Sequence, residues 1–228
     1  MEKCSNPRPR DDFASGCTIV TLELNPPTNG PLFLVDEKTG IGVREPAAPS
    51  QAVAPDQPAR REFEYVRHGT ADLLAAFALA TGLVSGIVRR QHRASEFIEL
   101  LRLLDGMVPK LDVIHIILDP LRMHYSAEVA VYLAYRPWRF EFHWLPVHGS
   151  WLSFIEGWFA ILSEKCLDRG EWVEFDDAAR DILAFIETYD THRAHPFTWQ
   201  KGGIKFYQRL KDKLAKKRLT VIPIAEAA

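Results

Sequence analysis

The apolar run Val113–Leu118 limits what this chain can fold into more than any other feature. It is rich in β-branched residues, interrupted only by His115, and it ends at Asp119. Such a run is typical of a strand buried in a sheet that helices cover. One segment before this run and three after it have the spacing of amphipathic or apolar helices, at residues 95–108, 126–135, 150–167 and 176–189. The pattern therefore predicts an α/β sandwich around a mixed sheet.

Further strands are expected on both sides of this run. Leu32–Val35 is a short apolar run that closes at Asp36, and Lys38-Thr39-Gly40 predicts a turn into a second short strand. Residues 65–90 are ambiguous, because alanines at 71–80 favour a helix whereas the Thr81-Gly82 break favours two strands. We expect two strands there and a short aromatic strand through Phe140 and Phe142.

The chain divides into three parts by composition. Residues 1–30 hold four prolines and no sustained periodicity, which predicts a linker arm. With 228 residues, 47% of them hydrophobic, the chain can bury one sizeable core, which we place at 31–192. Residues 193–228 form a basic C-terminal tail. Three scattered cysteines and no apolar stretch of bilayer length indicate a cytoplasmic protein without a membrane segment.

Three carboxylates are candidates for the functional centre. Asp36 and Asp119 each close an apolar run and are expected near strand ends, where open sheets build their sites, although either alone could merely start a turn. Glu156 lies in an apolar helical segment, on a stripe with small residues that either faces solvent or leaves room for a cation. Carboxylates without thiols favour Mg²⁺ or Mn²⁺, in a two-metal site.

Other polar residues are candidates for supporting roles. His124 and His148 lie close in sequence to the carboxylates, although bonding to a backbone carbonyl is the commoner role of such a histidine. The net charge of −2 means that any contact with DNA must rest on local basic patches. The candidates are Arg89, Arg90, Arg93, Lys201, Lys205 and Arg209. The alternative for each patch is a solvated helical face.

Several sequence blocks carry a specific resemblance to a known family. The chain resembles the DDE transposases of bacterial insertion sequences in the mariner superfamily. The blocks, in order, are Leu34–Thr39, Tyr65–Thr70, Leu118-Asp119 with His124, Leu145–Phe159 and Pro196–Trp199. The spacing of 36 residues between Asp119 and Glu156 also suits that superfamily.

The resemblance implies a ribonuclease-H-like fold, with a mixed five-stranded sheet flanked by helices. It also implies that Asp36, Asp119 and Glu156 hold the metal ions, with His124, His148 and Ser153 around them. Water would attack first at the element end, and the freed 3′-hydroxyl would then attack target DNA. The implied partners are element-end and target DNA, a second copy of the chain on that DNA, and a separate helix-turn-helix subunit, with nucleoid association when DNA is bound.

Two positions depart from the family pattern. Pro120 and Ser153 stand where the family usually has asparagine, and Pro120 lacks an amide that could orient Asp119. An alternative function is therefore a catalytically silent derivative that binds DNA or transposase subunits as a regulator. Another ribonuclease-H-like nuclease, such as a resolvase, is disfavoured by the specific block around Glu156.

Overall fold

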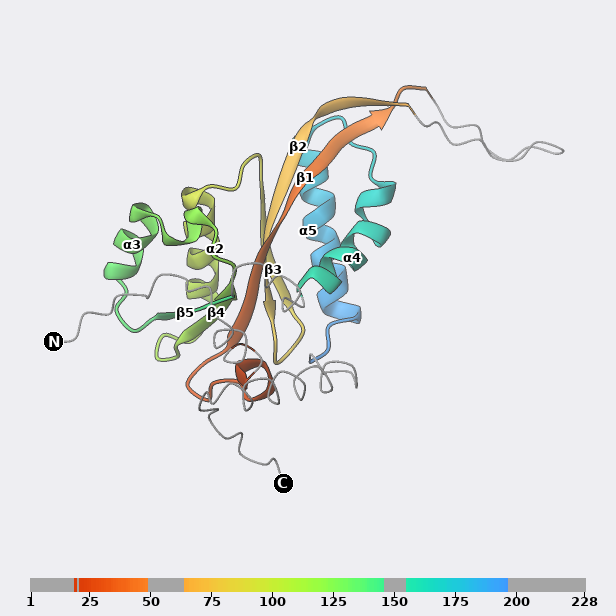
Figure 1. Cartoon of the computed structure of the whole chain (residues 1–228). Coiled ribbons are helices and arrows are strands. Elements are labelled where there is room, and N and C mark those ends of the chain that lie inside the picture. The colour runs from red at the N-terminus through yellow and green to blue at the C-terminus, as the bar shows by residue number, and fades with distance from the viewer. Residues whose placement is uncertain (1–18, 20, 49–63, 146–154, 197–228) are drawn as a thin grey trace, which may run out of the picture.

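A mixed five-stranded sheet forms the centre of the computed structural model, which describes residues 19, 21–48, 64–145 and 155–196 (Figure 1). The strand order is β3-β2-β1-β4-β5. The first three strands of the chain pair antiparallel, whereas β4 pairs parallel with β1 and β5 parallel with β4. The strands are β1 (Leu32–Pro46), β2 (Tyr65–Ala78), β3 (Val84–Arg89), β4 (Ile114–Leu118) and β5 (Phe140–Trp144).

Helices cover both faces of this sheet, as the apolar run in β4 requires. The helices α2 (Ala94–Met107) and α3 (Ala127–Ala134) lie on one side, and α4 (Ile155–Lys165) and α5 (Phe175–His192) lie on the other (Figure 1). Period-two alternation divides β1 between two cores. Leu32 and Leu34 pack with α4 and α5, whereas Phe33 and Val35 pack with α2. The predicted mixed sheet flanked by helices is confirmed.

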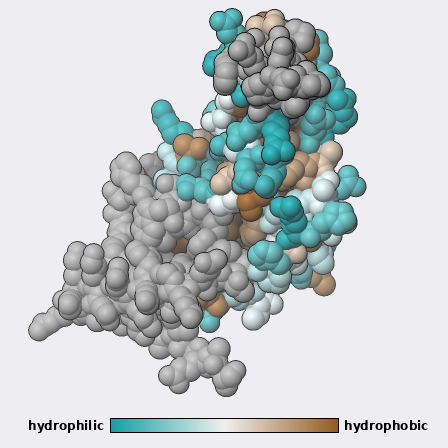
Figure 2. Space-filling view, turned by 90° about the vertical axis from the view of Figure 1, so that its right-hand side faces the viewer, coloured by the Kyte–Doolittle hydropathy of each residue, from teal (hydrophilic) through white to brown (hydrophobic). Residues whose placement is uncertain are grey.

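The α5 helix shows why the second layer forms. Its buried residues Ala178, Ile182, Ile186 and Tyr189 recur every three or four positions, so they form one apolar face against the sheet. The outward side of this layer is mostly hydrophilic, with only scattered apolar side chains (Figure 2). No helix within the described residues is both long and apolar enough to span a bilayer.

The predicted turn at Lys38-Thr39-Gly40 is wrong, because β1 continues through it. Lys38 pairs with Leu73 and Ile41 with Ala71, so two residues of β1 oppose Asp72 alone and form a β-bulge. Gly40 has a φ of 69°, which suits glycine, and its N–H donates a hydrogen bond of 2.8 Å to the Asp72 carboxylate. Asp36 therefore lies inside a long strand rather than at a strand end.

The expected linker arm contains part of the packed structure. Residues 21–24 are helical, and Ile19, at 1% exposure, belongs to the core beneath α4 and α5. The strand pair expected at 65–90 is confirmed as β2 and β3. The remaining expected helices and strands agree with the structure to within a few residues, except that 150–154 and the tail from 197 lie outside the described residues.

Candidate metal centre

Asp36 and Asp119 are brought together by the parallel pairing of β1 with β4. The last paired residues of this ladder are Leu34 and Ile117. Asp36 and Asp119 each lie two positions further along, Asp36 within β1 and Asp119 directly after β4, so they lie at about the same level along neighbouring strands that are about 4.8 Å apart. The sheet thus places two carboxylates beside each other near its centre.

Glu156 reaches the same region from α4. The buried residues Ile155, Trp158, Phe159 and Leu162 fix this helix on the face of β1 that carries Leu32 and Leu34. Asp36 has the same parity along β1 and therefore points toward that face. Glu156 and Gly157 are exposed, and no atom of the described residues lies within 4 Å of a Cβ placed on Gly157, so this part of the structure leaves space beside Glu156.

The electrostatics of Asp36 show that the three carboxylates interact. Burial raises the pKa of the Asp36 carboxyl to about 7, although the N–H of Glu37 donates a hydrogen bond of 2.8 Å to it. The charges of Glu37, Asp119 and Glu156 raise this pKa further. Among the described residues, no lysine or arginine forms an ion pair with Asp36 or Glu156. A cluster of oxygen donors with excess negative charge fits a hard divalent cation.

His124 connects Asp119 to a second buried carboxylate. Its Nδ1 lies 2.9 Å from the backbone oxygen of Asp119 and 3.2 Å from the Asp119 carboxylate, and its Nε2 lies 2.9 Å from Glu37. Burial opposes a charge on this ring, but the hydrogen bonds to Asp119 and Glu37 raise the pKa of His124 to about 10. His124 therefore forms a charged, hydrogen-bonded link between Glu37 of β1 and Asp119 after β4. It also packs in a tilted arrangement against the Phe97 ring of α2, with ring centroids 4.5 Å apart.

Glu37 was absent from the sequence-based candidates. Its side chain is only 3% exposed, and it shares the parity of Phe33 and Val35, whose side chains enter the core beneath α2. That alternation was the available signal, since it predicts that Glu37 points inward and needs a partner. The structure also groups Glu37, Asp119 and His124 closely enough to share a cation, whereas Asp36 and Glu156 lie outside this tight group.

Asp119 is oriented despite the proline that follows it. The N–H of Leu121 donates a hydrogen bond of 3.3 Å to the Asp119 carboxylate, and His124 contacts the same carboxylate from the other side of the turn. Donors at positions 121 and 124 thus act where Pro120 has none. His148 and Ser153 lie outside the described residues.

The expected DNA-contacting arginines gather where β3 leads into α2. Arg89 forms an ion pair of 2.8 Å with Glu99, and Arg90 lies over the Phe175 ring at 4.3 Å. Arg93 is exposed at the start of α2. Lys201, Lys205 and Arg209 lie outside the described residues.

Comparison with solved structures identifies the fold. The chain is similar to the strand transfer complex of Mos1, with a TM-score of 0.58, 14% identity, and coverage of 97% of this chain and 67% of that one. It is also similar to the Mos1 mariner paired end complex with Mn, with a TM-score of 0.57, 15% identity and coverage of 96% and 68%. The catalytic domain of Mos1 mariner transposase gives a TM-score of 0.56 at 13% identity, covering 97% of this chain and 100% of that one.

These similarities show the fold alone, which is the expected ribonuclease-H-like fold, and the chain spans about two thirds of the longer Mos1 chains. No curated protein matches the sequence. A family model described as DDE superfamily endonuclease matches residues 31–178, well over half of the chain. The chain therefore belongs to the DDE superfamily endonuclease family.

Proposed function

We propose that this chain is the catalytic domain of a mariner-superfamily transposase from a bacterial insertion sequence. In this proposal it cleaves the element ends and joins them to target DNA, with Mg²⁺ or Mn²⁺ held by Asp36, Asp119 and Glu156. The observation that supports it best is the convergence of these carboxylates from β1, β4 and α4, where their charges raise the pKa of Asp36. When bound, the divalent ions would activate the attacking oxygen and stabilise the leaving one.

The protein side chains position the reaction in this scheme. Leu121 and His124 hold the Asp119 carboxylate in one orientation, which a rigid ligand set requires. The described residues leave room beside Gly157 for a phosphodiester next to Glu156. Since phosphoryl transfer needs mainly positioning and charge stabilisation, these residues suffice without a nucleophilic side chain of the protein.

DNA binding would rest on local charge, since the whole chain carries a net charge of −2. Arg93 is the best-placed described residue, because Arg89 and Arg90 already contact Glu99 and Phe175. We propose Lys201, Lys205 and Arg209 as further contacts, a second copy of the chain on the paired ends, and a separate helix-turn-helix subunit that reads the terminal repeats. Arg93→Ala should weaken DNA binding, whereas Arg180→Ala on the outward side of α5 should not.

The direct test is metal-dependent nicking of element-end DNA with a DNA-binding partner supplied. Asp119→Asn should abolish nicking and the rise in thermal midpoint that Mn²⁺ causes in the wild type. The matched control is Asp177→Asn, which removes an exposed carboxylate that pairs with Arg180 and should change neither measurement. Equal nicking by wild type and Asp119→Asn would refute the assignment. A folded wild type without any Mn²⁺-dependent shift or nicking would favour the silent regulator instead.

A further inference from the structure

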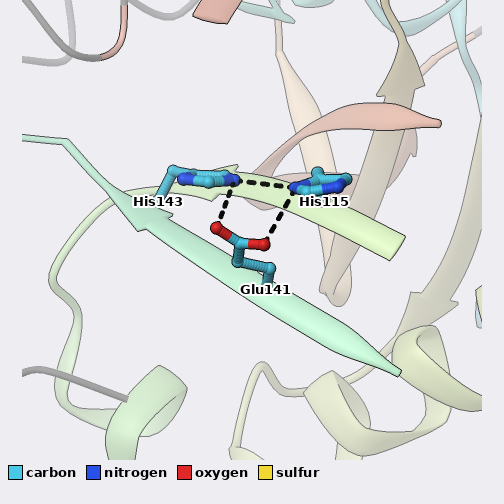
Figure 3. Close-up of side chains that lie close together, drawn as sticks. All are labelled: His115, Glu141 and His143. Carbon is cyan, nitrogen blue, oxygen red and sulfur yellow. Dashed lines mark hydrogen bonds and ion pairs between the residues drawn. The ribbon is translucent and has the colours of Figure 1, made fainter. Parts of the chain in front are cut away.

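A second cluster of ligand-type side chains lies on the outer strands of the sheet. His115 of β4 pairs directly with Glu141 of β5, and His143 follows two residues later on the same face of β5 (Figure 3). The imidazole rings are stacked with centroids 5.4 Å apart. Their facing nitrogens, Nδ1 of His115 and Nε2 of His143, are 3.1 Å apart. The strand register alone therefore brings two imidazoles and a carboxylate together.

Asn29 determines which ring nitrogen of His115 carries the proton. The Nε2 of His115 lies 2.9 Å from the side-chain oxygen of Asn29, an acceptor, so this nitrogen carries the proton of the neutral ring. The lone pair of Nδ1 then points toward His143 and Glu141. Burial lowers the pKa of His115 and lowers that of His143 to about 4, which keeps both rings neutral. A metal-binding histidine commonly has such an outer hydrogen-bond partner.

The spacing of the donor atoms suits a small tetrahedral ion. The Glu141 oxygens lie 3.6 Å from the His115 nitrogen and 4.0 Å from the His143 nitrogen. Ligands about 2.0 to 2.1 Å from a tetrahedral centre are separated by about 3.3 Å. This value lies within the range of the distances between the three groups, from 3.1 Å between the two histidine nitrogens to 4.0 Å between Glu141 and His143. Side-chain rotation of Glu141, which is 57% exposed, closes the longer gaps.

We propose that His115, Glu141 and His143 form a binding site for a borderline divalent metal of the Zn²⁺ class, with water as the fourth ligand. Imidazole nitrogens favour Zn²⁺ or Co²⁺ over Mg²⁺, so this site selects a different metal from the carboxylate centre. His115 precedes Asp119 by four residues, about 13 Å along a strand, so the sites are separate. The bound metal cross-links edge strand β5 to β4, the strand that Asp119 directly follows.

Co²⁺ is the probe for this site, because its visible absorption reports tetrahedral coordination. The full chain is titrated with Co²⁺ in excess Mg²⁺, in the Asp119→Asn background, since among the described residues the group Glu37–Asp119–His124 is the other cluster that could hold this ion. One equivalent should bind with tetrahedral bands and raise the thermal midpoint by several degrees. His143→Gln should abolish binding. Asn29→Ala should weaken it by about 10–100-fold.

Controls separate loss of the site from loss of the fold. Glu141→Gln changes an exposed side chain and should weaken Co²⁺ binding while the apo midpoint stays unchanged. His92→Gln removes a histidine paired with Asp72 on the opposite part of the sheet and should bind Co²⁺ as the parent does. Absence of stoichiometric Co²⁺ binding, or binding unchanged by His143→Gln and Glu141→Gln, would overturn the proposal. Zn²⁺-soaked crystals should place an anomalous peak between the three side chains.

Discussion

The hydrogen-bonded link that His124 forms between Glu37 and Asp119 can be tested by its contribution to the free energy of unfolding. His124→Phe keeps a ring of similar size against Phe97 but removes both ring nitrogens. The Glu37 carboxylate, 3% exposed, then loses its bond from Nε2, and its other oxygen accepts no hydrogen bond from the part of the chain that the structure describes. Breaking a buried charge pair by deleting one partner costs about 3–5 kcal/mol. We expect a loss of that size in the free energy of unfolding.

A double-mutant cycle isolates how much the interaction between Glu37 and His124 contributes to the free energy of unfolding. Glu37→Met alone leaves His124 bonded to Asp119 and should cost about 1–3 kcal/mol. The double variant replaces both partners with apolar groups of similar shape, so it should cost less than the sum of the single variants by about 2–4 kcal/mol. Urea unfolding measures each value, provided that the m-value is unchanged. His68→Phe, in an exposed pair with Glu45, should cost under about 1 kcal/mol.

The same variants separate stability from activity. His124→Phe also frees the Asp119 carboxylate, so nicking at a temperature where the variant is folded should fall by about 10–100-fold. Glu37→Met retains the contact between His124 and Asp119 and should lose less activity. Additive unfolding energies, or a cost below about 1 kcal/mol for His124→Phe, would refute the reasoning.

Three further predictions concern the frame around the site. Arg139 is 8% exposed and donates five hydrogen bonds to the end of α2 and the loop after it. Arg139→Met should therefore lower the free energy of unfolding, measured by urea denaturation, by about 3–5 kcal/mol, and a variant as stable as the wild type would contradict this. Burial raises the pKa of Glu23 to about 9, so its stabilisation is complete below about pH 4.5 and is lost as pH rises through 9. The free energy of unfolding of Glu23→Gln should therefore exceed that of the wild type by on the order of 5 kcal/mol at pH 8 but not at pH 4, and parallel pH profiles of the two would exclude this. A methyl group on Gly30 would lie 1.8 Å from the Val113 carbonyl, so Gly30→Ala should cost more than about 2 kcal/mol, whereas the same change at Gly106, with open space around it, should not destabilise α2.

The sequence predicts those features that depend on local periodicity. The strand at 114–118 and the α5 helix follow from spacing that a window of a few residues reveals. The bulge at Lys38–Gly40 does not, because a Lys-Thr-Gly sequence is compatible with a turn or a bulge. Asp72, some 32 residues away, accepts the Gly40 N–H and settles the choice.

The residues of the candidate site also differ in whether local sequence or distant contacts reveal them. Asp36 and Asp119 were selected from the sequence because each closes an apolar run, and that property is local. The alternation along β1 predicts that Glu37 points inward, but its partner cannot be predicted, because the ring nitrogen comes from His124, 87 residues away. The His115, Glu141 and His143 cluster depends likewise on the register between β4 and β5, which neither strand specifies alone.

The charge balance at the centre gives Glu37 a role that a purely structural residue would not have. Asp36 is surrounded by the carboxylates of Glu37, Asp119 and Glu156, and His124 is the one charged donor that contacts this group within the described residues. Because the His124 ring bonds to Glu37 as well as to Asp119, its positive charge is shared between the two carboxylates. The three remaining carboxylates then keep the negative charge that attracts divalent ions. Without Glu37, the cluster would lose one negative charge while His124 kept its contact with Asp119, so Glu37→Met should weaken Mn²⁺ binding even though Glu37 itself need not be a ligand.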